Sequence, residues 1–210
     1  MLTDKSCAPM PHGAPLAGVD EAGRGPLAGP VVAAAVLLGE QPLPPGVTDS
    51  KQLRAERRTE LAAGIRDCSA AWALGVASVA EIEQLNILGA TMLAMQRAVA
   101  GLAVTPGHVL VDGNRAPRFE CAAGLVPTTT VVRGDASEIC IGAASILAKV
   151  HRDALMVELD GRFPEYGFAR HKGYATAEHR AALVEYGATV EHRATYAPVR
   201  AALEASELRR

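Results

Sequence analysis

The sequence predicts an α/β fold in which helices cover both faces of a mixed sheet. Three observations lead to this fold class. Short apolar runs rich in β-branched residues come first, helical patterns rich in Ala and Leu then alternate with further short runs, and helical patterns alone end the chain. With 210 residues, 49% of them apolar and 21% charged, the chain is long enough for one well-buried domain.

Each expected strand is a short apolar run, and each expected helix shows apolar residues at helical spacing. The strands are predicted over residues 16–20, 31–38, 71–78, 108–112 and 128–132. The helices are predicted over residues 54–67, 79–86, 87–102, 138–160, 176–186 and 198–208. Loops are predicted around the proline-rich stretch 42–46, at Pro106-Gly107 and over residues 163–173.

Residues 1–15 are expected to form a flexible N-terminal tail, because they hold three prolines and a glycine and no helical or strand pattern. Residues 16–210 are then expected to form one catalytic domain. Its helical C-terminal part begins near residue 160.

Net charge and cysteine usage narrow the class of protein. The formal net charge is −2, from 21 Lys and Arg against 23 Asp and Glu, which is not the strongly basic balance of a bulk nucleic-acid binder. The four cysteines form no C-x-x-C pair, which argues against a zinc knuckle and predicts free thiols in a reducing compartment. The sequence has no apolar signal core and no run of about 18 apolar residues. We therefore expect a cytoplasmic protein that has no membrane-spanning segment and does not act at a membrane.

Acidic residues stand where the predicted strands end. Asp20 and Glu21 close the first strand, Asp112 closes another, and Asp135 comes just after a third. The carboxyl ends of neighbouring strands meet at one crevice, so these side chains are expected to converge. Since side chains alternate along a strand, the two adjacent acids cannot point the same way. The alternative is that the acids form turns or cap helices, as Asp135 alone would do for the helix over 138–160.

The residue types in this acidic set indicate a particular kind of metal site. Four carboxylates without His or Cys partners suit Mg²⁺ or Mn²⁺, whereas zinc prefers nitrogen or sulfur ligands. Two such ions about 4 Å apart can activate a water and stabilise the leaving oxygen of an in-line displacement. The sequence therefore predicts divalent-cation chemistry on a phosphodiester.

A glycine-flanked arginine, Gly23-Arg24-Gly25, follows the first acidic pair. The glycines let backbone amides approach a sugar-phosphate closely, and the arginine can hold a phosphate. The spacing of the glycines does not match the dinucleotide-binding fingerprint. The alternative interpretation is a plain turn that joins two strands.

A second candidate segment is His171-Lys172-Gly173-Tyr174, which combines two potential cations with an aromatic ring. The ring can stack on a sugar or a base, and its hydroxyl can donate a hydrogen bond. The alternative is a surface loop that is anchored by its tyrosine.

The long helix carries Ser145 and Lys149 four residues apart, with Asp153 on the same face. The first two match a Ser–Lys nucleophile dyad. A small hydroxyl packed in a core helix and an ion pair between Lys149 and Asp153 are the favoured interpretation.

Blocks of sequence, in chain order, resemble the signatures of bacterial ribonuclease HII. These blocks are Gly18–Pro26, Asp49–Lys51, Glu83–Leu88, Val111–Asn114, Gly134–Asp135, Ala143–Val150 and His171–Tyr174. The resemblance implies a ribonuclease H-like fold, a mixed five-stranded sheet flanked by helices with a helical C-terminal portion. The short stretch before the first strand favours this family over the related ribonuclease HIII, which usually carries an extra N-terminal domain.

The resemblance also implies an activity. It is endonucleolytic cleavage of the RNA strand of RNA–DNA hybrids and of the 5′ side of ribonucleotides embedded in duplex DNA, by two-metal-ion hydrolysis with Mg²⁺ or Mn²⁺. The products carry 3′-hydroxyl and 5′-phosphate ends, the cellular role is ribonucleotide removal from DNA, and a monomer is expected. A junction resolvase or exonuclease of the same fold and a binding module that has lost catalysis are the alternatives. The presence of all four acids argues against loss of catalysis.

The family's functional residues carry over position by position. Its metal-binding and catalytic acids match Asp20, Glu21, Asp112 and Asp135. Its glycine-arginine-glycine element matches Gly23, Arg24 and Gly25, and its junction-sensing tyrosine matches Tyr174. Lys51 and Lys172 are expected to hold phosphates together with the arginine. One departure is Arg133, where many relatives have a lysine, so the charge is kept while the geometry changes.

Overall fold

The structure, a computed structural model, describes residues 15–47, 53–121 and 124–208. Its centre is a five-stranded sheet in the strand order β3-β2-β1-β4-β7. The strands are β1 (Leu16–Ala22), β2 (Val31–Leu38), β3 (Ser69–Ala77), β4 (His108–Asp112) and β7 (Thr128–Val131). β1, β2 and β3 pair antiparallel, whereas β1, β4 and β7 pair parallel. The sheet is therefore mixed, which confirms the predicted fold class.

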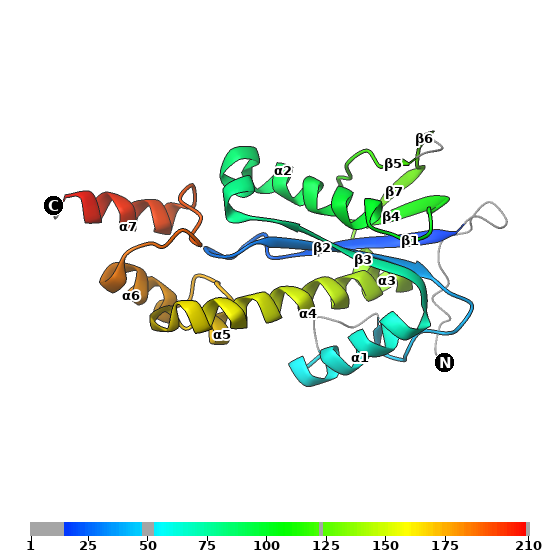
Figure 1. Ribbon diagram of the computed structural model, residues 1–210, viewed down its shortest axis with the longest axis horizontal. Coiled ribbons are helices and arrows are strands. Elements are labelled where there is room, and N and C mark those ends of the chain that lie inside the picture. Colours follow the sequence, from blue (N-terminus) through cyan, green and yellow to red (C-terminus); the bar gives the residue numbers. More distant parts are fainter. Residues whose placement is uncertain (1–14, 48–52, 122–123, 209–210) are drawn as a thin grey trace.

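Helices cover both faces of this sheet (Figure 1). α2 (Val79–Ala100) lies on one face, and α1 (Ala55–Cys68) and α4 (Ile139–Arg162) lie on the other. The odd-numbered residues of β2 belong to the apolar cluster under α2, and Val32, Ala34 and Val36 belong to the cluster under α1 and α4. A strand that is buried on both faces has a continuously apolar sequence, which is why this strand was predicted with its correct bounds.

A glycine in β1 lets α4 approach the sheet closely. A Cβ added at Gly18 would lie 2.2 Å from the carbonyl carbon of Cys140 in α4, so no larger residue fits unless the backbone moves. The close contact places α4 directly behind β1. As a result, side chains of α4 and of the end of β1 share one space.

α2 contains a break at Asn86, whose φ of 58° and ψ of 171° are not helical. The side-chain Oδ1 of Asn86 accepts hydrogen bonds from the N–H of Leu88 at 2.9 Å and of Gly89 at 3.2 Å. The asparagine therefore caps a second helical segment. This agrees with the separate helices predicted over 79–86 and 87–102.

The C-terminal part is helical and has an apolar core of its own. Its elements are the 3-10 turn η2 (Pro164–Tyr166) and the helices α5 (Phe168–His171), α6 (Ala177–Tyr186) and α7 (Ala197–Glu207). Their buried side chains pack with Leu27 and Ala28, which follow β1, and with Met156 of α4. In Figure 1, α6 and α7 extend the molecule beyond one end of the sheet. The C-terminal part thus lies against the segment that leaves β1.

The structure differs from the sequence prediction in several short elements. β1 continues to Ala22, so the first acidic pair lies within the strand and not at its end. Three short elements were not expected: β5 (Glu120–Cys121), β6 (Gly124–Leu125) and α3 (Gly134–Ser137). The predicted loop over 163–173 contains η2 and α5. Elements of two to four residues are too short to show a hydrophobic period, which explains why they were missed.

Other expectations concern the cysteines and the chain ends. Cys68, Cys121 and Cys140 are free thiols, as predicted. Within the described ranges, no helix is both long and apolar enough to cross a bilayer. Residues 1–14 of the predicted tail lie outside the described part of the chain, so the tail and the division into one domain stay predictions.

Candidate active site

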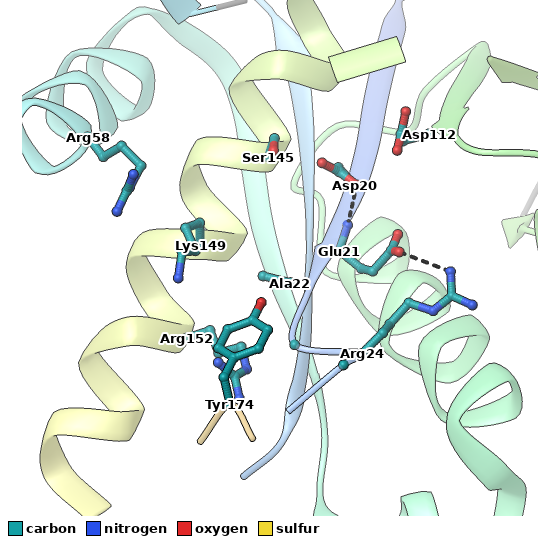
Figure 2. Close-up of a pocket in the computed structure, with 12 residues that line it drawn as sticks. Asp20, Glu21, Ala22, Arg24, Arg58, Asp112, Ser145, Lys149, Arg152 and Tyr174 are labelled. Carbon is teal, nitrogen blue, oxygen red and sulfur yellow. Dashed lines mark hydrogen bonds and ion pairs between the residues drawn. The ribbon is translucent and has the colours of Figure 1, made fainter. Parts of the chain in front are cut away.

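A pocket of about 430 Å³ opens where β1, β4 and α4 meet. Asp20, Glu21 and Asp112 line one side of the pocket, and Arg58 and Lys149 line the other. Figure 2 shows these two groups facing each other across the end of β1. The pocket therefore has an acidic wall and a basic wall.

The parallel pairing of β1 with β4 places two of the acids side by side. Val19 of β1 pairs with Val111 of β4, so the next residue on each strand is an aspartate. Figure 2 shows the carboxylates of Asp20 and Asp112 turned toward one another, whereas Glu21 points toward the arginine that follows the strand. The opposite directions of the two adjacent acids follow from side-chain alternation along a strand, as predicted.

Burial and like charge disfavour ionisation of Asp20 and Glu21. Burial raises the pKa of Asp20 well above its usual value, and the nearby charges of Glu21 and Asp112 raise it further. Hydrogen bonds from the Ser145 side chain and from the Glu21 N–H, at 2.7 Å, act in the opposite direction. Burial also raises the pKa of Glu21, against the lowering effect of Arg24. A proton or a cation therefore stabilises this acidic wall.

Asp112 fixes the start of α3, where the fourth predicted acid lies. Its Oδ1 accepts the N–H of Gly134 at 2.7 Å and the N–H of Asp135 at 3.4 Å. Asp135 is buried next to Asp112 but is not among the residues that line the pocket. The residue at the N-cap position of α4 is Glu138, three residues after Asp135.

The basic wall is organised around one carboxylate. Lys149 Nζ lies 2.6 Å from Asp153 Oδ1, which confirms the ion pair expected from the sequence. Arg58 Nη2 lies 3.9 Å from Asp153 Oδ2. Ser145 lines the pocket and bonds Asp20, so its interpretation as a packed core hydroxyl is wrong. Two cations share one anion, and the wall keeps a net positive charge that suits a phosphate.

The glycine-arginine-glycine element forms the rim of the pocket next to the acids. Gly23 has a φ of 102°, a conformation that favours glycine. The side chain of Arg24 is half exposed, and its Nη1 lies 3.4 Å from Glu21 Oε1. A pair at this distance with one half-exposed partner is weak, so the guanidinium can turn to a phosphate at little cost. The element is at once the turn between β1 and β2 and part of the pocket.

Tyr174 lies across the rim from this element. Its side chain is 47% exposed, and a Cβ added at Gly25 would lie 3.7 Å from Tyr174 Cε1. Lys172, in contrast, donates from its ammonium group to the carbonyl of Ala169 and does not line the pocket. Lys51 falls outside the described residues, and its role stays a prediction.

Sequence reasoning missed two of the arginines that line the pocket. Arg58 comes from α1, and nothing in its local sequence pattern separates it from the other arginines of that helix. Arg152 interrupts the apolar face of α4 and is 1% exposed. The sequence did contain a signal for Arg152, because a charged residue at a core position of a helix indicates a specific role.

The donors on the acidic wall match a hard divalent cation. They are carboxylate oxygens alone, which Mg²⁺ and Mn²⁺ prefer. Among the described residues, no three acidic, His or Cys side chains are grouped closely enough to enclose an ion as they stand. The charges of Glu21 and Asp112 both act on Asp20, so the three carboxylates lie near one another. The residues that could hold a metal are therefore these three, with Asp135 beside them.

Comparisons with known proteins agree on one family. The family model of Ribonuclease HII matches residues 17–199. Ribonuclease HII 1 of Methylibium petroleiphilum is 61% identical over 189 residues, which cover 89% of this chain and 92% of that protein. The crystal structure of ribonuclease H2 from Pyrococcus horikoshii has a TM-score of 0.78 at 26% identity, with 91% of this chain and 98% of that chain covered.

A more distant structure has a similar fold. The crystal structure of Bst-RNase HIII in complex with Mn²⁺ has a TM-score of 0.74 at 20% identity, with 94% of this chain and 71% of that chain covered. The family match spans the sheet, the pocket and most of the C-terminal helices. The chain thus belongs to the ribonuclease HII family of bacteria and is a type 2 ribonuclease H, an endoribonuclease that acts on RNA–DNA hybrids.

Proposed function

We propose that this chain cleaves the RNA strand of hybrids and also the 5′ side of single ribonucleotides embedded in duplex DNA. The observation that carries the proposal is the shared pocket. Asp20, Glu21 and Asp112 face the same space as Gly23–Gly25 and Tyr174. The residues suited to hydrolysis and those suited to recognising a sugar-phosphate thus lie around one cavity.

The acids are proposed to hold two divalent cations, Mg²⁺ or Mn²⁺, with Asp135 joining Asp20, Glu21 and Asp112. The raised pKa of Asp20 supports this role, because a bound cation offsets the burial and the repulsion that cause it. Bst-RNase HIII, which has a similar fold, was crystallised with Mn²⁺. When bound, such ions supply a water nucleophile and stabilise the leaving oxygen, which gives 3′-hydroxyl and 5′-phosphate ends.

Recognition is proposed to depend on shape at the ribonucleotide. The glycines at the rim leave room for a sugar-phosphate to approach the backbone, and Arg24 is free to turn to a phosphate. The ring of Tyr174 stacks on the sugar that follows the ribonucleotide and packs best when that sugar is a deoxyribose without a 2′-hydroxyl. Specificity is then independent of base sequence.

The basic residues outside the rim are proposed to set the register of the duplex. Lys51 and Lys172 hold phosphates in this proposal, and Lys172 must first release the carbonyl of Ala169. We further propose that the chain acts as a cytoplasmic monomer that removes ribonucleotides from DNA.

A panel of duplexes tests the proposed function. The chain is incubated with Mg²⁺ or Mn²⁺ and three substrates: an RNA–DNA hybrid, a DNA duplex with one ribonucleotide, and an all-DNA duplex. We expect cleavage of the first two, with a cut 5′ to the ribonucleotide and a 3′-hydroxyl end, and no cut in the third. Cleavage of the all-DNA duplex would favour a junction resolvase or exonuclease instead, and an intact single-ribonucleotide duplex would contradict the proposal.

A further inference from the structure

Two arginines are completely buried behind the rim of the pocket. Arg152 is 1% exposed and Arg193 is 0% exposed. Burial, and after it the charge of Arg193, lowers the pKa of Arg152 to about 10, so the two cations lie near each other and Arg152 stays protonated at neutral pH. No carboxylate of the described residues lies within 4.0 Å of either guanidinium. Burying two charges without a carboxylate partner costs folding free energy unless other polar groups contact them.

Arg193 gathers the backbone carbonyls of the segment that follows β1. Its Nη2 donates to Gly23 O at 2.6 Å and to Gly29 O at 2.7 Å. Its Nη1 donates to Arg24 O at 3.0 Å. The hydroxyl of Tyr196 donates to the same Arg24 carbonyl at 2.6 Å and accepts from Arg193 Nη1 at 3.1 Å.

Arg152 connects the same segment to the tyrosine loop. Its Nη2 donates to Ala28 O at 3.2 Å, its Nε to Pro30 O at 3.1 Å, and its Nη1 to Lys172 O at 3.0 Å. A Cβ added at Gly23 would lie 2.1 Å from Arg152 Nε, so the first glycine of the rim leaves the space that this arginine fills. The two arginines therefore hold both sides of the rim together.

These contacts determine where the amides of the rim point. In a trans peptide the N–H lies opposite the C=O of the same unit. The carbonyls of Gly23 and Arg24 face inward to Arg193, so the N–H groups of Arg24 and Gly25 face outward. Within the described part of the chain, no acceptor is found for either N–H. Both residues are exposed, and Gly25 faces Tyr174 across the rim.

We propose that Arg193 and Tyr196 are positioning residues, which hold the carbonyls of Gly23 and Arg24 inward and so aim two adjacent N–H groups at an oxygen of the bound ribonucleotide. Arg152 acts with them by fixing the tyrosine loop to the same segment. Two neighbouring N–H groups backed by buried positive charge suit an oxygen acceptor. This inference rests on the proposed function and adds residues that do not themselves touch the substrate.

Tyr196→Phe tests the proposal with the smallest change. It removes one hydroxyl that donates to Arg24 O and leaves the ring next to Arg193. The matched control is Tyr166→Phe, which removes a hydroxyl that donates to Gly187 O at 2.8 Å, away from the pocket. We expect both variants to lose similar thermal stability. Only Tyr196→Phe should lose kcat/KM on the single-ribonucleotide duplex, by about five- to tenfold.

A second measurement separates positioning from a general loss of structure. The amide resonances of Arg24 and Gly25 are followed in ¹H–¹⁵N spectra of the free protein. We expect them to shift in Tyr196→Phe and to stay unchanged in Tyr166→Phe. Arg193→Lys keeps the charge but loses the fork of donors, so it should lower kcat/KM more than Tyr196→Phe does. If Arg193→Lys does not fold, the comparison of Tyr196→Phe with Tyr166→Phe is by itself the test of the positioning role.

The outcomes distinguish failure of this inference from failure of the proposed function. If the unmodified chain does not cut the single-ribonucleotide duplex, the proposed function fails and this inference fails with it. If the unmodified chain cuts it, while Tyr196→Phe matches Tyr166→Phe in kcat/KM and in both amide resonances, the positioning role alone is overturned.

Discussion

The carboxylate of Asp20 is buried beside two other acids, and its charge opposes folding more than it supports it. We predict that Asp20→Asn reduces cleavage at least about 100-fold in Mg²⁺, because it removes a ligand from the proposed metal site. The same change should raise the free energy of unfolding in EDTA by about 1 kcal/mol, or about 2–4 °C in Tm. The asparagine oxygen can still accept the Glu21 N–H.

The control for this prediction is an acid that lies away from the pocket. Asp67→Asn, on the exposed side of α1, should change neither cleavage nor thermal stability. Full activity of Asp20→Asn would remove this residue from the site. A large loss of stability would show that its charge is needed for folding instead.

A second prediction at the residue scale concerns the ring of Tyr174 and its contribution to substrate recognition. A stacked ring is worth about 1–3 kcal/mol per base by truncation to alanine. We therefore predict that Tyr174→Ala lowers kcat/KM on a single-ribonucleotide duplex by about 5- to 160-fold, and that Tyr174→Phe keeps most of the kcat/KM. The side chain is 47% exposed, so its stability cost should be small. Equal rates for Tyr174→Ala and the unmodified chain would exclude a recognition role.

At the scale of single elements, the break in α2 gives a prediction about stability. Asn86 has a φ of 58° and caps the second half of the helix through its side chain. Asn86→Ala loses the cap and strains the backbone, so we expect a loss of about 2 kcal/mol in urea unfolding. Asn86→Gly keeps the positive φ and should lose less. If both variants are as stable as the unmodified chain, the cap makes no contribution to stability.

The same scale shows which elements the sequence could predict. β2 was predicted with its correct bounds because it is apolar throughout, and Asn86 marked the division of α2. The end of β1 was missed because Asp20 and Glu21 are polar and stop the apolar run, while the ladder with β2 continues through Ala22. Pairing with another strand, and not local pattern, decides where such a strand ends.

At the scale of the whole molecule, a buried histidine pair predicts a pH dependence. His179 Nε2 lies 3.0 Å from His192 Nε2. Burial, and after it the neighbouring His179, lowers the pKa of His192 to about 4. Between pH 6.5 and 4 the unfolded chain binds a proton that the folded chain does not, so stability falls as the pH falls through this window. We expect a loss on the order of 2 kcal/mol.

The comparison with a variant isolates this histidine from other titrating groups. His192→Asn can still accept the Thr189 N–H through its side-chain oxygen. This variant should be less stable than the unmodified chain at pH 7.5. The difference in the free energy of unfolding between the two chains should become smaller by pH 5. A gap that stays constant over this range would mean that His192 is not neutral in the folded protein.

The whole molecule also sets the limit of what the sequence could predict about the site. Asp20, Glu21 and Asp112 were found because each follows a short apolar run in the sequence, and the structure brings them to one pocket. Arg193 contacts Gly23 from 170 residues away, and no local pattern connects two such positions. The residues that position a site come from elements that are distant in the sequence. They can therefore be identified only from the folded structure.

The central claim is that carboxylates from β1 and β4 jointly hold divalent cations. Calorimetric titration with Mn²⁺ tests it most directly, because it needs no substrate and no turnover. We expect the unmodified chain and Asp67→Asn to bind Mn²⁺ alike, and Asp20→Asn and Asp112→Asn each to bind it at least about tenfold more weakly. Unchanged Mn²⁺ affinity in both pocket variants would contradict the account.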